Sequence, residues 1–187
     1  LPAYAGRTMQ AELEALDKAL GAPAKPVIAI VGGAKVSTKL DLLENLVAKV
    51  DALVIGGGMA NTFLAAKGLS VGKSLLEKDR IDDAKRILET AESKGVTILL
   101  PTDIVVAKEV TRGAEHKIVP AHKIPNSWSA VDVGPVSTKT FEEALADAKT
   151  VVWNGPLGVF EVPTFGDGTR AMARFLSKRA QEGASVI

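Results

Sequence analysis

The chain has 187 residues, of which 47% are apolar and 24% charged, so it can bury one ordinary core and a single domain is expected. The 23 basic and 22 acidic side chains leave a net charge of +1, which gives no electrostatic reason to expect nucleic acid or a membrane surface as a partner. The absence of cysteine excludes disulfides and thiolate metal sites and is consistent with a cytoplasmic protein. The apolar runs fall far short of the roughly 20 residues that a membrane span needs.

Along the chain, short apolar strands alternate with amphipathic helices. The first expected helix covers residues 8–20, where apolar side chains recur at steps of three and four, and a linker with Pro23 and Pro26 follows. Strands are then expected over residues 27–31, 52–55, 96–100, 130–133, 150–153 and 184–187. Further helices are expected over residues 37–49, 59–67, 80–94, 136–148 and 169–178, and an irregular hairpin over residues 104–118.

This alternation predicts an α/β fold with a doubly wound, mainly parallel sheet and helices on both faces, a Rossmann-like arrangement of three layers. In such a sheet the loops that follow the strands meet at one edge, where ligands bind. Three unusual loops follow predicted strands in this chain, at residues 31–39, 55–59 and 153–161. They are therefore the candidate binding site.

The first loop reads Val-Gly-Gly-Ala-Lys-Val-Ser-Thr-Lys over residues 31–39. Its glycines allow close approach of a ligand to the backbone, and Ser37 or Thr38 is expected to cap the following helix. Lys39 would lie in the first helical turn, and Lys35 would add a second cation beside the positive end of the helix dipole. This favours an anion such as a phosphate, although the spacing matches neither the Walker loop nor Gly-x-Gly-x-x-Gly. The alternative is a tight turn with two solvated lysines.

The other two loops differ in what they offer a ligand. The triplet at residues 56–58 carries no polar side chain, so it would form either a flat wall for a base or a site of close helix packing. The loop over residues 153–161 combines Asn154, suited to a phosphate oxygen, with Glu161, suited to a ribose diol. Its backbone is shaped by Gly155, Pro156 and Gly158. The alternative here is a structural loop with a solvated Glu161.

The remaining chemically notable residues do not suggest a second site. His116 and His122 lack partners at metal-ligand spacing and are expected at the surface, while Trp128 and Trp153 are expected to anchor the core or a loop. No nucleophilic triad or pair of carboxylates placed for acid–base work is evident, and no metal ligands are assigned. The chemistry implied is positioning and charge neutralisation, which is what phosphoryl transfer requires.

Taken together, the motifs resemble those of the phosphoglycerate kinase family. The resemblance rests on Gly-Gly-Ala-Lys-Val-Ser-Thr-Lys at 32–39, Gly-Gly-Gly-Met-Ala-Asn-Thr-Phe at 56–63, Val-Gly-Lys-Ser-Leu at 71–75 and Trp-Asn-Gly-Pro-Leu-Gly-Val-Phe-Glu at 153–161. It implies that residues 1–20 are an inter-domain linker helix and residues 21–187 a nucleotide-binding domain that is incomplete at its C-terminal end. The implied reaction moves the acyl phosphate of 1,3-bisphosphoglycerate to MgADP, giving ATP and 3-phosphoglycerate in glycolysis.

The resemblance also assigns roles to individual residues. Lys35 and Lys39 would neutralise the transferring phosphoryl group. The nucleotide would contact Gly33, Ala34, Lys39, Gly56, Gly57, Leu75, Val131, Asn154, Pro156, Gly158, Val159 and Glu161. Mg²⁺ would accompany ADP or ATP, with its aspartate expected beyond Ile187, and phosphoglycerate would bind an N-terminal domain that these residues do not include. A monomer that is inactive on its own is therefore expected.

Two other interpretations remain open from the sequence. A dinucleotide-binding dehydrogenase domain shares the strand–helix alternation, but it would have Gly-x-Gly-x-x-Gly after its first strand and an acidic residue closing its second. A non-catalytic interaction module could use the same fold, although no large apolar patch or charge run marks a docking surface. Titration with MgADP and NADH would separate the three.

Overall fold

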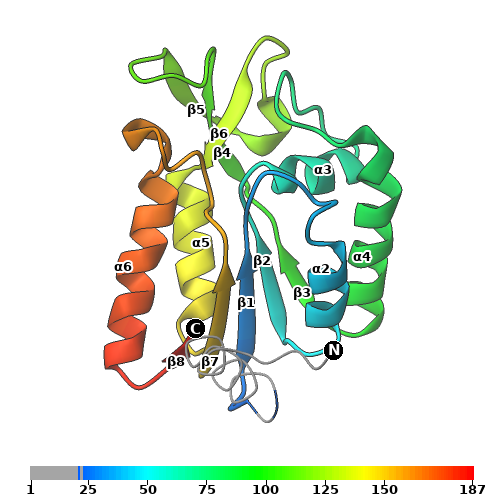
Figure 1. Ribbon diagram of the computed structural model, residues 1–187, viewed down its shortest axis with the longest axis vertical. Coiled ribbons are helices and arrows are strands. Elements are labelled where there is room, and N and C mark those ends of the chain that lie inside the picture. Colours follow the sequence, from blue (N-terminus) through cyan, green and yellow to red (C-terminus); the bar gives the residue numbers. More distant parts are fainter. Residues whose placement is uncertain (1–20, 22) are drawn as a thin grey trace, which may run out of the picture.

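A five-stranded parallel sheet forms the centre of the molecule (Figure 1). The computed structural model describes residue 21 and residues 23–187, so the helix expected over residues 8–20 lies outside the described residues. The strands are β1 (Val27–Val31), β2 (Ala52–Ile55), β3 (Thr97–Leu99), β7 (Thr150–Asn154) and β8 (Ser185–Val186). Their order in the sheet is β3-β2-β1-β7-β8, so β1 is central, and all five of its residues are buried. A strand covered on both faces needs the unbroken apolar run that this segment has.

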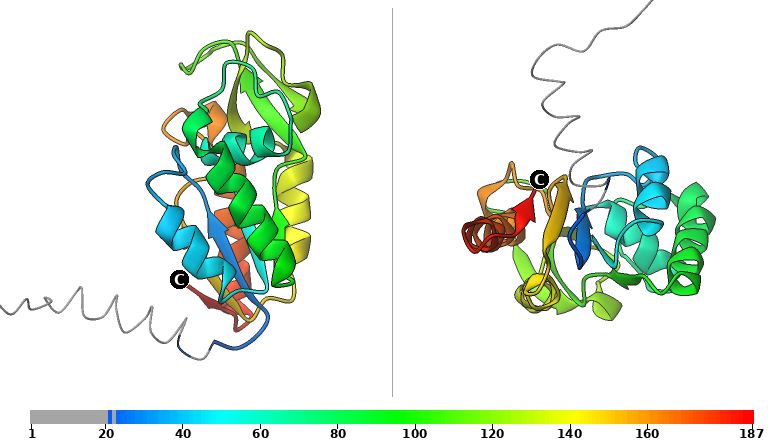
Figure 2. Two further views of the ribbon diagram at one scale, coloured as in Figure 1. Left: turned by 90° about the vertical axis from the view of Figure 1, so that its right-hand side faces the viewer. Right: turned by 90° about the horizontal axis from the view of Figure 1, so that it is seen from below.

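Helices cover both faces of the sheet, as Figures 1 and 2 show. Side chains of α2 (Leu40–Val47), α3 (Met59–Ala66) and α4 (Ile81–Ser93) form one core with Val27, Ala29 and Val31 of β1. Those of α5 (Pro135–Leu145) and α6 (Asp167–Gln181) form a second core with Ile28 and Ile30. Successive residues of a strand point to opposite faces, which is why β1 contributes to both cores. The predicted doubly wound α/β fold is confirmed.

A smaller antiparallel sheet lies beyond the carboxyl ends of the central strands, at the top of Figure 1. It consists of β4 (Asp103–Ala107), β5 (His116–Pro120) and β6 (Ser129–Val133), in the order β5-β4-β6. The hairpin expected over residues 104–118 is thus confirmed as β4 and β5. Trp128 is buried beneath this sheet, as expected, and both histidines are exposed. The connections contain the short 3₁₀ helices η1 (Lys78–Arg80), η2 (Ala121–Lys123) and η3 (Pro163–Phe165).

One helix start differs from the sequence-based expectation. The helix expected from residue 37 begins at Leu40, and its N-cap is Lys39 without a side-chain capping bond. The hydroxyl of Thr38 instead donates to the carbonyl of Lys35 at 2.9 Å, and Ser37 bonds to the carboxylate of Glu77. The prediction that Ser37 or Thr38 caps this helix is therefore wrong, because both side chains are used by other partners.

None of the helices in the described residues is both long enough and apolar enough to cross a membrane.

Candidate functional site

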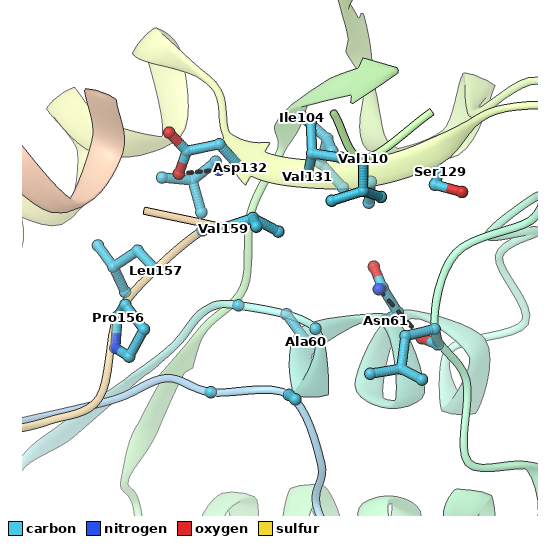
Figure 3. A pocket seen from close by; sticks show the side chains of 18 of the residues that line it. Ala60, Asn61, Ile104, Val110, Ser129, Val131, Asp132, Pro156, Leu157 and Val159 are labelled. Atoms are coloured by element: carbon cyan, nitrogen blue, oxygen red, sulfur yellow. Dashed lines mark hydrogen bonds between the residues drawn. The ribbon is translucent and has the colours of Figure 1, made fainter. Parts of the chain in front are cut away.

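A cleft of about 540 Å³ opens where the carboxyl edge of the central sheet faces the small sheet (Figure 3). Three loops form its floor because β1, β2 and β7, which they follow, lie near one another in the sheet. Nine of the predicted nucleotide-binding residues line the cleft: Gly33, Ala34, Gly57, Leu75, Val131, Pro156, Gly158, Val159 and Glu161. Segments separated by more than a hundred residues therefore meet at one site, as a parallel sheet predicts.

The three loops are joined by backbone hydrogen bonds. The amide of Gly57 donates to the carbonyl of Leu157 at 2.9 Å, and the amide of Met59 donates to the carbonyl of Gly33 at 2.9 Å. Gly57 has a φ of +67°, and a Cβ on it would lie only 2.6 Å from the backbone nitrogen and oxygen of Gly33. Gly56 is buried behind the cleft, where a Cβ would collide with Leu157. The glycines thus allow the loops to pack directly against one another.

Lys39 and Asn154 connect the first loop to the third. The ammonium of Lys39 donates to the carbonyl of Gly32 at 2.5 Å and to the side-chain oxygen of Asn154 at 2.6 Å. Neither Lys39 nor Asn154 lines the cleft itself, but the ammonium lies 3.3 Å from the position that a Cβ on Gly33 would take, and Gly33 does line it, so the charge lies at the margin of the cleft. Burial lowers the pKa of Lys39. Since its bonded partners are neutral oxygens, the positive charge is left to attract an anion.

Lys35 stands at the exposed side of the same loop and does not line the cleft. The nearby carboxylate of Glu77 accepts hydrogen bonds from the amide of Ser37 at 3.0 Å and from its hydroxyl at 2.5 Å. Partial burial raises the pKa of Glu77, but the bonds from Ser37 and the charge of Lys35 bring it below its ordinary value. Glu77 therefore fixes the loop that carries both lysines, a role that the sequence analysis did not assign.

Asp132 is the other acidic residue of the site that sequence reasoning missed. It lines the cleft from β6, is 3% exposed, and accepts hydrogen bonds from the amides of Val133 and Gly168, each at 2.9 Å. Burial raises its pKa to about 6. A Cβ on Gly158 would collide with this carboxyl group. The signal available in the sequence was an acidic residue between two valines, Val131 and Val133, of a predicted strand.

The raised pKa predicts a pH dependence of stability that Asp132→Asn removes. Because the folded-state pKa exceeds the unfolded value, the native state binds an extra proton between pH 4 and 6, and the contribution of Asp132 to the free energy of unfolding falls as pH rises. The loss amounts to at most about 3 kcal/mol by pH 7. In urea titrations, the stability of Asp132→Asn relative to the unchanged protein should therefore increase from pH 4 to pH 7. A constant difference would contradict this prediction.

The described residues do not form a metal site by themselves. Within residue 21 and residues 23–187, no group of three or more histidine, aspartate or glutamate side chains could hold a metal ion. Asp132 is already engaged with backbone amides, and Glu161 is exposed. Among the described residues, the structure therefore shows no preformed cluster of ligands for the Mg²⁺ that the resemblance pairs with ADP.

Comparisons with known proteins identify the family of this chain. A model of the phosphoglycerate kinase family matches residues 1–187. The phosphoglycerate kinase of Methylorubrum extorquens strain PA1 is 60% identical over 186 residues, covering 100% of this chain and 46% of that protein. That of Sinorhizobium medicae is 58% identical over 186 residues, covering 100% of this chain and 47% of that protein. This chain therefore spans about half the length of these curated relatives.

Solved structures give the same result. The phosphoglycerate kinase of Coxiella burnetii superimposes with a TM-score of 0.89 and 47% identity, covering 92% of this chain and 45% of that one. That of Pyrococcus horikoshii superimposes with a TM-score of 0.76 and 28% identity, covering 91% of this chain and 44% of that one. The sequence matches and the structural matches both cover nearly the whole of this chain. The chain belongs to the phosphoglycerate kinase family.

Proposed function

We propose that this chain forms the nucleotide side of a phosphoglycerate kinase that moves the acyl phosphate of 1,3-bisphosphoglycerate to MgADP. The observation that carries the proposal is the cleft itself, which has an apolar end next to glycine loops with a lysine at their margin. A nucleotide has the same division, with a flat base at one end and a polyphosphate at the other. The family match makes this use of the cleft more plausible than dinucleotide-dependent hydride transfer.

In the proposed reaction, a terminal phosphate oxygen of ADP attacks the phosphorus of the acyl phosphate. The bond from phosphorus to the acyl oxygen breaks, and 3-phosphoglycerate leaves as a carboxylate. Lys39 and Lys35 would stabilise the negative charge on the phosphoryl oxygens, and Asn154 would hold Lys39 in place. Glu161, at the exposed margin of the cleft, would accept hydrogen bonds from the ribose hydroxyls.

The same proposal extends to the organisation of the chain. Residues 1–20 would be an inter-domain linker helix and residues 21–187 the nucleotide-binding domain, with phosphoglycerate bound outside these residues. A cytoplasmic location, a monomeric state and the absence of kinase activity in the 187 residues alone stay predictions. A coupled assay for ATP formation would test the last of these.

Nucleotide binding can be measured through the tryptophans. The indole N–H of Trp153 donates to the carbonyl of Gly155 at 2.7 Å, one residue before the part of this loop that lines the cleft. Titration with MgADP is therefore expected to change the tryptophan fluorescence saturably, whereas NADH at the same concentrations should not. A saturable response to NADH alone, or to neither nucleotide, would contradict the proposed function.

A further inference from the structure

The apolar end of the cleft contains one buried polar side chain whose orientation is fixed. Asn61 is the third residue of α3, lines the cleft and is only 2% exposed. Around it the cleft is lined mainly by aliphatic side chains, among them Ile104, Val110 and Val131 (Figure 3). A buried amide in such surroundings is favourable only if its donors and acceptors are paired.

The hydrogen bonding of Asn61 shows which end of its amide faces the cleft. The side-chain nitrogen donates to the carbonyl of Leu75 at 3.1 Å. A carbonyl can only accept, so the NH₂ group must face Leu75 and the oxygen must face the other way. Figure 3 shows this oxygen directed toward the wall with Val110, Val131 and Ser129. Within the part of the chain that the structure describes, the nitrogen is the only side-chain atom of Asn61 that bonds to protein, and the oxygen is not among the fully buried unpaired atoms, so it is open to the cleft.

An unpaired acceptor in an apolar cleft selects for a ligand with a donor at that position. The 6-amino group of adenine is such a donor, and it also needs an acceptor when the base leaves water. Guanine and hypoxanthine carry an oxygen at the same position, which would bring two acceptors together. Lys39 bonds to Gly32, which packs against Pro156, and Figure 3 shows Pro156 and Asn61 on opposite sides of the cleft. With its charged end drawn toward Lys39, a nucleotide would have its base at the side where Asn61 lies.

We propose that Asn61 is a specificity-determining residue, whose side-chain oxygen accepts a hydrogen bond from the exocyclic amine of a 6-aminopurine nucleotide. The inference rests on the proposed function and adds to it the reason for preferring one purine over another. It assigns Asn61 two distinct tasks. Its nitrogen holds the backbone of Leu75, and its oxygen recognises the base.

The test compares three ligands that differ only at position 6 of the purine: MgADP, MgIDP with an oxygen there, and the diphosphate of purine riboside with a hydrogen. The 187-residue protein should bind MgADP roughly 10-fold or more tightly than MgIDP, with the third ligand between them. In Asn61→Leu the Kd values for the three ligands should converge to within about twofold, and Asn61→Ala gives the same comparison should the leucine variant not fold. If Asn61 acted only through its hydrogen bond to Leu75, its replacement would instead weaken the binding of all three ligands by the same factor.

Asn45→Leu is the matched control, because Asn45 also donates from a helix to a backbone carbonyl, that of Asp41 at 2.8 Å, but lies outside the cleft. It should keep the full discrimination between MgADP and MgIDP. The role of Asn61 would be overturned if the unchanged protein bound MgADP and MgIDP with equal affinity, or if both Asn61 variants still discriminated between these ligands as the unchanged protein does. Neither result would contradict the proposed nucleotide site. Absence of binding by all three ligands would overturn the proposed function and this inference with it.

Discussion

Replacing Lys39 with methionine is expected to weaken the binding of MgADP and MgATP by roughly 10- to 150-fold, the loss of a charge-assisted contact worth about 1.5–3 kcal/mol. Methionine keeps much of the aliphatic stem, so the change mainly removes the charge. The ammonium lies at the margin of the cleft, bonded to Gly32 and Asn154, both neutral. Isothermal titration calorimetry of the two proteins would give the ratio of their Kd values.

Two further variants show whether the loss of affinity is specific to the charge of Lys39. Glu161→Gln should cost less than Lys39→Met, because glutamine keeps an acceptor for the ribose hydroxyls and loses only the charge. Lys49→Met, at an exposed position after α2, should leave the Kd unchanged. Because Lys39 also bonds two loops together, the melting temperature of each variant should be measured alongside. If Lys39→Met and the unchanged protein bind MgATP equally, the proposed position of the phosphates is wrong.

The second large effect is expected for Gly57→Ala, which should abolish measurable nucleotide binding and lower the free energy of unfolding by roughly 2–5 kcal/mol. The residue has a φ of +67°, and a Cβ would lie 2.6 Å from the backbone nitrogen and oxygen of Gly33. The alanine must therefore push apart two loops that line the cleft. Urea denaturation and titration with MgADP would measure both consequences.

Gly68→Ala separates the clash from the backbone strain. Gly68 has a comparable φ of +82°, but no atom lies within 4 Å of the position that its Cβ would take. This variant should lose only about 1–2 kcal/mol of stability and bind MgADP normally. Equal losses of stability and of binding in Gly57→Ala and Gly68→Ala would show that contact between the loops is not needed to form the cleft.

The strands and their order of appearance could be predicted from the sequence because their signals are local. Residues 27–31 form an apolar run that only a doubly covered strand would need, and β1 has these bounds in the structure. The start of α2 could not be predicted in this way. Ser37 is a good capping residue by type, but its hydroxyl bonds to Glu77, which is 40 positions away.

The candidate site, too, was predictable only where its signals are local in the sequence. Glycine-rich loops after strands are visible in the sequence, and seven of the predicted residues that lie in these loops line one cleft. Asn61 and Asp132 were missed because their importance depends on burial and on partners that a linear pattern does not reveal. The bond between Lys39 and Asn154 likewise joins positions 115 residues apart.

The sequence by itself thus determined the elements, the parallel sheet and the edge at which a ligand should bind, because hydrophobic periodicity and glycine turns act over a few residues. Only the tertiary structure decided which polar atoms remain unpaired in the cleft, which lysine lies at its margin and which carboxyl group is buried. Those properties arise from the removal of water and from contacts between distant segments, and both exist only once the chain has packed.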